Sequence, residues 1–171
     1  EYISHPSQAR RIVTKAVQAA LTQKGVAVVI VNGDMFTESD DDEMDWAVYR
    51  PQPVSRPSDA EMAELAALVD AAGKVTVYAG IGARDARDEI IAFCEKVKAP
   101  MVHTTRAKEF LEPNNPYNVG VNGILGNKAG VEALEAADLV ISLGCDFAYT
   151  QYYPDGKKIA QIDIDPTHLG R

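Results

Sequence analysis

Glycines, cations and one carboxylate stand directly after four apolar segments of the sequence that read as strands. Gly80-Ile-Gly-Ala-Arg84 follows the first segment, Thr104-Thr-Arg-Ala-Lys108 the second, Gly144-Cys-Asp-Phe147 the third and Asp163 the fourth. Glycines let backbone N–H groups approach a phosphate, and Arg and Lys bind phosphate through their charge. A carboxylate accepts hydrogen bonds from ribose hydroxyls or from an adenine amino group. Together these residue types suit an adenine dinucleotide.

Each of these segments also has an explanation that needs no ligand. Gly80 and Gly82 can form a turn, and Asp85 replaces the third glycine of the G-x-G-x-x-G fingerprint. Asp163 can be an ordinary turn former. The signal lies in the combination, to which Asn122-Gly-Ile-Leu-Gly126 adds another close backbone approach ahead of an expected helix.

No catalytic set is visible. His5, His103 and His168 are far apart in the sequence, and no serine or cysteine nucleophile stands beside a base in a known signature. Cys94 and Cys145 cannot form a disulfide framework or a metal site by themselves. We therefore expect a chain that binds a cofactor and does not itself carry out the chemistry.

The composition narrows the classes of partner. The 171 residues carry a formal net charge of −8, which gives nucleic-acid binding no electrostatic basis. No apolar run reaches the roughly 20 residues of a transmembrane helix, and no signal peptide is recognisable. With two cysteines and Glu1 as its first residue, we expect the chain to be part of a longer cytoplasmic protein.

The elements that must position the candidate residues fall into three stretches. Residues 1–36 combine an expected amphipathic helix over 7–24 with an expected buried strand over 26–31, too little for a domain. Residues 37–57 are rich in acids and prolines, as is typical of a linker. We expect the tail of an upstream domain, a linker and then one domain over 58–171.

Helices and strands alternate in this last stretch, where Ser58 and Glu61 predict a capping box. This pattern predicts an α/β fold with a parallel sheet flanked by helices, whose strands all end at one edge. The expected helices begin at 58, 85 and 128 and end at 73, 98 and 137, and the expected strands cover 75–79, 100–104, 138–143 and 158–163.

Four segments resemble the central domain of thiamine-diphosphate-dependent enzymes, in the branch of pyruvate oxidase and pyruvate dehydrogenase (quinone). They are GIGAR at 80–84, KAPMVHTTRAKE at 98–109, NPYNVGVNGILG at 115–126 and QIDIDPTHLGR at 161–171. Residues 1–36 resemble the last helix and strand of the family's pyrimidine-binding domain. The resemblance implies a Rossmann-like three-layer domain that binds FAD.

The resemblance also implies which residues bind FAD. The flavin and ribityl chain would lie along the first glycine loop, the phosphates near two cations, and the adenosine at the last carboxylate. The implied cofactor-binding residues are Gly80, Ile81, Gly82, Ala83, Arg84, Thr105, Arg106, Lys108, Asn122, Gly123, Ile124, Leu125, Gly144, Cys145, Asp146, Phe147, Ala148, Tyr149 and Asp163.

Two residues depart from the pattern of the family. Ala107 stands where many relatives carry glycine, and Asp146 stands where uncharged residues are commoner. A carboxylate near the pyrophosphate is unfavourable unless it points away.

For the full-length enzyme the resemblance implies oxidative decarboxylation of pyruvate, with electrons passing through FAD to quinone or oxygen. Thiamine diphosphate and Mg²⁺ would lie in the absent pyrimidine- and pyrophosphate-binding domains, so the chain alone would be inactive. A homotetramer is expected, in the cytoplasm or at the inner face of the membrane. Three alternatives stay open: an enzyme like acetolactate synthase with non-redox FAD, a cofactor-free spacer domain, and NAD binding.

Overall fold

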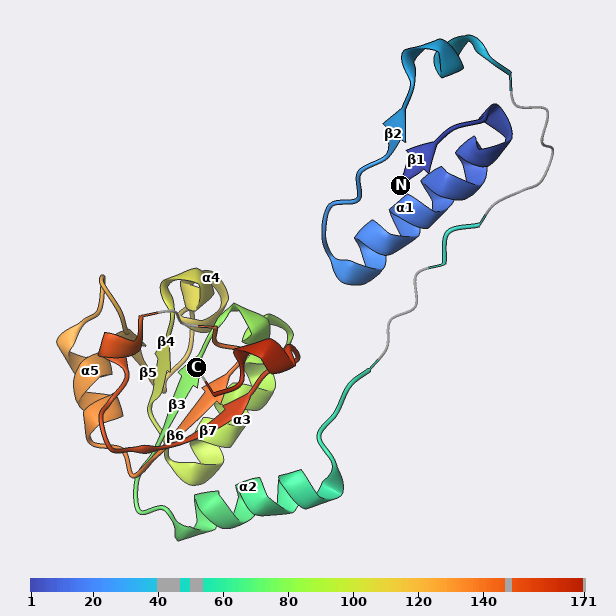
Figure 1. The fold of residues 1–171 in the computed structure, drawn as a ribbon. Coiled ribbons are helices and arrows are strands. Elements are labelled where there is room, and N and C mark those ends of the chain that lie inside the picture. Colours follow the sequence, from blue (N-terminus) through green and yellow to red (C-terminus); the bar gives the residue numbers. More distant parts are fainter. Residues whose placement is uncertain (40–46, 50–53, 147–148, 171) are drawn as a thin grey trace. The chain divides into compact units, whose positions relative to one another are not determined.

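The computed structural model describes residues 1–39, 47–49, 54–146 and 149–170, and it divides the chain into two units (Figure 1). The first unit comprises Glu1–Val54 and the second Ser55–Arg171. The boundary falls inside the stretch 37–57 that the sequence marks as a linker. That residues 1–36 belong to a pyrimidine-binding domain stays a prediction.

The first unit is one helix beside a short strand pair. Helix α1, Ala9–Gln23, lies within the expected range, whereas the buried strand expected over 26–31 is wrong. Only β2, Ile30–Val31, is a strand, paired in parallel with the unexpected β1, Tyr2–Ile3, and Val26 is 94% exposed. An apolar run becomes a buried strand only where other elements cover it, and the described part of this unit offers only β1, α1 and two short 3-10 helices.

The second unit contains a five-stranded sheet in which every pairing is parallel, in the order β5-β4-β3-β6-β7. The strands are β3 (Val75–Ala79), β4 (Met101–His103), β5 (Asn118–Val121), β6 (Leu139–Leu143) and β7 (Lys158–Ile162). Strand β5 was not expected from the sequence, because it is short and includes Gly120 at a φ of 121°.

The helices of this unit begin and end close to the expected positions. The capping box is confirmed, since the Glu61 N–H donates to Ser58 Oγ at 3.2 Å and the Ser58 N–H to Glu61 Oε2 at 2.7 Å. No helix in the described part of the chain is long and apolar enough to span a membrane. The helices are α2 (Asp59–Ala71), α3 (Arg87–Val97), the unexpected α4 (Lys108–Leu111) and α5 (Lys128–Glu135).

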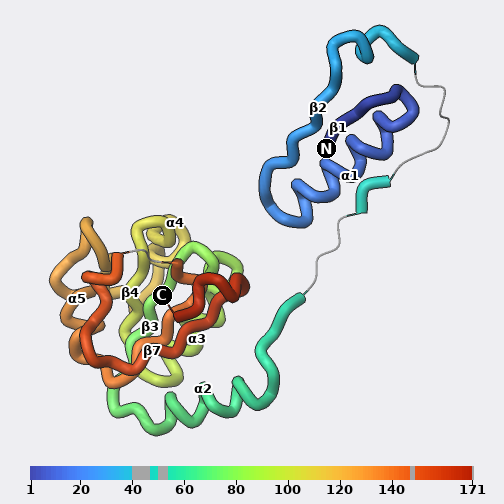
Figure 2. Tube along the Cα trace, viewed as in Figure 1, coloured from blue at the N-terminus to red at the C-terminus, as the bar shows by residue number. Residues whose placement is uncertain are grey.

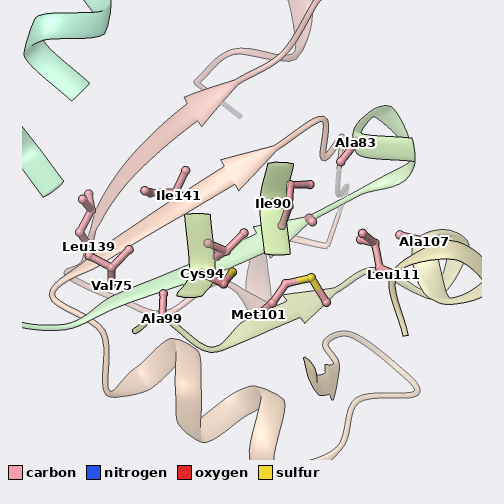
Figure 3. Packing of buried hydrophobic residues seen from close by; sticks show 12 residues of the cluster. Val75, Ala83, Ile90, Cys94, Ala99, Met101, Ala107, Leu111, Leu139 and Ile141 are labelled. Atoms are coloured by element: carbon pink, nitrogen blue, oxygen red, sulfur yellow. The ribbon is translucent and has the colours of Figure 1, made fainter. Parts of the chain in front are cut away.

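The sheet is the middle of three layers, as the sequence predicts. Side chains alternate along β3, so that Val75 and Val77 pack in one cluster with Ile90 and Cys94 of α3. Figure 3 shows Val75, Ile90 and Cys94 in this cluster. Tyr78 points to the other face, into a second cluster that includes residues of α5. The trace in Figure 2 shows α3 and α5 on opposite sides of the strands.

Candidate functional site

The strands of the second unit all end at one side of the sheet, which we call the carboxyl edge. There the residue after each of four strands donates its backbone N–H to the last carbonyl of a neighbouring strand, so the loops leave the sheet in a defined register. The four bonds run from Gly80 to Leu143, from Gly144 to Ile162, from Thr104 to Ala79 and from Asn122 to His103, at 2.9, 2.8, 3.0 and 3.1 Å.

Three of the predicted glycines pack against one another. The Gly82 N–H donates to the Gly144 carbonyl at 3.0 Å. A Cβ at Gly80 would lie 2.4 Å from the Gly144 oxygen, and a Cβ at Gly82 would lie 2.8 Å from the Gly144 Cα. Gly144 itself has a φ of 52°, a conformation that favours glycine. The contact between the loops after β3 and β6 therefore requires these glycines, whether or not they also contact a cofactor.

Two of the three predicted cations already lie beside carboxylates of the short segment around α4. Arg84 Nη2 lies 3.9 Å from Glu109 Oε2, and its guanidinium lies over the Phe110 ring, 5.1 Å from the centroid. Lys108 Nζ lies 3.1 Å from Glu112 Oε2. All four charged side chains are more than 40% exposed, so water screens both pairs.

The third predicted cation differs from the other two. Arg106 and Thr105 are exposed in a 3-10 helix, Thr105–Ala107, that follows β4. Within the residues that the structure describes, Arg106 has no ion pair. Ala107 is fully buried in the cluster that includes Leu111, so its methyl group, absent from a glycine, fills space in the core.

Three predicted cofactor-lining residues turn their side chains inward. Ala83 and Cys145 are 5% and 2% exposed, and burial raises the pKa of the Cys145 thiol to about 11. Asn122 is 1% exposed, and its Nδ2 donates to the Tyr152 carbonyl at 2.8 Å. If these residues line a cofactor, as the sequence predicts, we expect the contacts to be made by their backbone atoms.

Other predicted residues do face outward. Ile124 and Leu125 are 67% and 69% exposed in the loop after β5, and Tyr149 is 46% exposed. Gly123, which precedes them, is buried at a φ of 115°. Phe147 and Ala148, which the sequence also placed at the site, lie outside the described residues.

The predicted adenosine carboxylate takes part in a group that we call the His168 cluster, formed by His168, Asp146, Asp163 and Asp165. Asp163 is only 7% exposed, and its Oδ1 accepts the Asp165 N–H at 2.9 Å. His168 Nδ1 lies 3.3 Å from Asp163 Oδ1, and Nε2 lies 3.4 Å from Asp146 Oδ2. The sequence did not single out His168, although a histidine three residues after an aspartate that starts a turn was a usable signal.

The family comparison matches most of the second unit. The model of the family described as thiamine pyrophosphate enzyme, central domain, matches residues 62–171. A 42.6 kDa protein of Pseudomonas amyloderamosa is 41% identical over 100% of this chain and 44% of its own length. YdaP of Bacillus subtilis, named as a candidate thiamine pyrophosphate-containing protein, is 33% identical over 94% of this chain and 28% of its own.

More distant relatives carry the names of different enzymes. Pyruvate oxidase of Lactiplantibacillus plantarum is 28% identical over 94% of this chain and 28% of its own length. Acetolactate synthase large subunits and a trihydroxycyclohexane-dione hydrolase match at 27–29%. The chain therefore spans less than half the length of the relatives it matches.

The same fold occurs in solved structures. The thiamine diphosphate-dependent 4-hydroxybenzoylformate decarboxylase of Rhodococcus jostii superposes with a TM-score of 0.70 at 19% identity, over 100% of this chain and 34% of that chain. Benzoylformate decarboxylase of Polynucleobacter necessarius gives 0.70 at 20% identity, with the same coverage. At this identity the likeness shows the architecture alone.

Proposed function

Because the chain belongs to the thiamine pyrophosphate enzymes through its match to their central domain over residues 62–171, we propose that the second unit binds FAD. One arrangement carries the proposal: a cation, Arg106, and a carboxylate, Asp163, follow parallel strands that end at the same edge. Among the described residues Arg106 has no ion pair. A dinucleotide presents phosphates to cations and ribose hydroxyls to a carboxylate, and ligands of parallel α/β sheets bind at this edge.

The charged residues at the carboxyl edge fit the phosphates of FAD. Arg106 would meet them first, since it has no ion pair to give up within the described chain. Arg84 and Lys108 would join it by leaving Glu109 and Glu112. Exposed ion pairs contribute at most about 1 kcal/mol each, so this exchange costs little.

The apolar residues of the edge fit the other end of FAD. Ile124 and Leu125 expose two thirds of their surface in the loop after β5. A flavin ring gains binding free energy by covering such side chains. The exposed backbone of Gly82 leaves room for a close approach to the ribityl chain, because no side chain stands there.

We further propose that the complete enzyme oxidatively decarboxylates pyruvate. Bound FAD would accept the electrons and pass them to quinone or oxygen. The pyruvate oxidase relative, aligned over 94% of this chain, supports this choice. The residues of this chain would bind and orient FAD. Thiamine diphosphate and Mg²⁺ would be held by regions that the relatives carry outside their shared part, so the chain alone would not turn over pyruvate.

Two observations favour alternative functions for the chain. Acetolactate synthase of Corynebacterium glutamicum aligns over 99% of this chain at 27% identity, which suits an FAD that takes no part in net redox chemistry. Gly80, Gly144 and Asp163 have partners within the chain, so a spacer domain without a cofactor would also use them.

Binding of FAD to the chain tests the proposed site. We expect Arg106→Ala and Asp163→Ala to weaken FAD roughly tenfold or more, as loss of a charge-assisted hydrogen bond does. Lys158→Ala is the control, because it removes an exposed cation at the amino end of β7, away from the carboxyl edge. If neither site variant weakens FAD more than the control, the proposed site is wrong; NAD titrations exclude or support the other dinucleotide.

The visible spectrum of the complete enzyme separates the candidate reactions. Flavin absorbance that bleaches when pyruvate, thiamine diphosphate and Mg²⁺ are added supports the oxidase. Flavin that stays oxidised while pyruvate is consumed supports the synthase-like candidate. A colourless protein that gains no flavin from added FAD supports the spacer.

A further inference from the structure

The segment around α4, which we call the α4 turn (residues 105–113), carries two carboxylates that lie beside cations of the proposed FAD site. Glu109 Oε2 lies 3.9 Å from Arg84 Nη2, which belongs to the loop after β3. Glu112 Oε2 lies 3.1 Å from Lys108 Nζ. Glu112 follows α4 directly and keeps helical backbone angles. Because residues three apart in a helical turn lie on the same side of it, both carboxylates lie on one side of the α4 turn.

The backbone of the α4 turn is fixed to the rest of the unit. Arg87 of α3 donates Nε–H to the Phe110 carbonyl at 2.9 Å, and its Nη2 donates to the Pro113 carbonyl. Asn115 Nδ2 donates to the Leu111 carbonyl at 3.0 Å, and the Leu111 side chain is fully buried. We therefore expect the backbone that carries the two carboxylates to stay in place when their partner cations move.

Water and neighbouring groups remain available to the charged side chains when either ion pair opens. The Arg84 guanidinium lies over the Phe110 ring, 5.1 Å from the centroid, and this contact does not depend on a carboxylate. Glu112 Oε2 lies 3.8 Å from His103 Nε2, a buried nitrogen without a hydrogen-bond partner in the described chain. Glu112 therefore keeps a polar neighbour when Lys108 leaves.

The two carboxylates match the two phosphates of a dinucleotide in number and in charge. Each phosphate of a diphosphate diester carries one negative charge, as each carboxylate does. Phosphates and carboxylates also bind Arg and Lys through the same kind of charge-assisted hydrogen bond. A diphosphate is therefore suited to take Arg84 and Lys108 from their carboxylates, one phosphate for each carboxylate.

We propose that Glu109 and Glu112 are positioning residues that hold Arg84 and Lys108 in the cofactor-free chain and are displaced together by the diphosphate of the dinucleotide. The inference rests on the proposed FAD site and adds an internal competitor to it. Removing the competitor should tighten FAD binding. A carboxylate that only supported the fold would give the opposite sign, because its loss would weaken binding or stability.

The two carboxylates should differ in the strength of their competition. The pair of Glu112 with Lys108 is the shorter one, and Glu112 is 42% exposed, against 81% for Glu109. Water screens the more exposed charge more strongly. We expect Glu112→Gln to tighten FAD about threefold and Glu109→Gln about twofold, as loss of exposed ion pairs allows. The two factors should multiply in the double variant if the diphosphate contacts both cations.

FAD titrations of the wild-type chain, the two single variants and the double variant at low ionic strength test this inference. Glu132→Gln is the matched control. Glu132 Oε1 lies 3.5 Å from Lys128 Nζ in α5, with the same four-residue spacing as Glu112 and Lys108, and neither residue is predicted to bind FAD. The control removes the same charge from the chain, so it corrects for the change in net charge. Added salt should reduce the gain of the double variant, because salt screens exposed charges.

The outcomes separate this inference from the proposed function. A double variant that binds FAD more tightly than the wild type and the control supports the inference. A double variant that binds FAD no more tightly than Glu132→Gln overturns it while leaving the FAD site intact, and so does a double variant that binds more weakly. Absence of FAD binding in all five proteins overturns the proposed function itself, and with it this inference.

Discussion

Gly80→Ala should destabilise the second unit without any cofactor present, because this glycine makes room for a neighbouring loop. The added methyl group would lie 2.4 Å from the Gly144 oxygen and 2.6 Å from the Cys145 Cα, both backbone atoms. Ordinary contact begins near 3.4 Å, so the loop after β6 would have to yield by about 1 Å in a close-packed interior.

The loss can be worked from what such a shift breaks. Overpacking of this kind costs about 1–3 kcal/mol. Moving the loop also weakens the bonds from Gly80 to Leu143 and from Gly82 to Gly144, each worth about 1 kcal/mol net. We expect Gly80→Ala to lower the free energy of unfolding by about 2–4 kcal/mol.

Urea unfolding followed by far-UV circular dichroism measures this loss. Gly156→Ala is the control in the same unit, since a Cβ there meets nothing within 4 Å and only the φ of 68° is unfavourable, at about 1 kcal/mol. A Gly80→Ala protein as stable as the control would refute the packing explanation and return this glycine to a role in ligand binding alone.

Four further predictions concern stability and reactivity. Because burial raises the pKa of Cys94 and Cys145 to about 11, only about 0.1% of each thiol is ionised at pH 8, so both should react slowly with a disulfide reagent, and equal rates in native and urea-unfolded protein would contradict this. The same raised pKa means that the unfolded thiols ionise first, so the free energy of unfolding should fall as pH rises above about 9; a flat pH profile would argue against it. Asn127→Ala removes two hydrogen bonds from the Asn127 side chain to the backbone of β5, and it should lower the free energy of unfolding by about 1–2 kcal/mol in urea. The exposed Gln151→Ala is the control, and a loss no greater than the control's would contradict this prediction. Ser58→Ala removes the capping box of α2 and should cost about 1 kcal/mol; an unchanged helix signal and midpoint would show that the cap contributes nothing.

The local sequence pattern was enough to predict most of the helices and strands of the second unit. Ser58 and Glu61 mark the start of α2 because a cap depends on residues three apart, and the bonds are present as expected. Three of the four apolar segments became the strands β3, β4 and β6, which are buried on both faces, whereas β7 at the sheet edge is partly exposed. Continuous apolar runs of this length suit only such a position.

Local pattern failed where the outcome depends on distant partners. Val26–Val31 has the composition of a buried strand, yet most of it stays unpaired because the described part of its unit provides few neighbours. Strand β5 has only four residues and a glycine at positive φ, and it forms because β4 lies beside it. Cys145 reads as a loop residue, but it packs inward against the cluster around Tyr78.

The sequence by itself determined that strands alternate with helices and that glycines, cations and a carboxylate follow those strands, because both depend on residues close together in the chain. Only the tertiary structure decided what these residues contact. Gly80 and Gly82 approach the loop of Gly144, some 60 residues later, and Asp146 faces His168. Such contacts depend on how the loops of separate strands meet at the carboxyl edge, which no local pattern encodes.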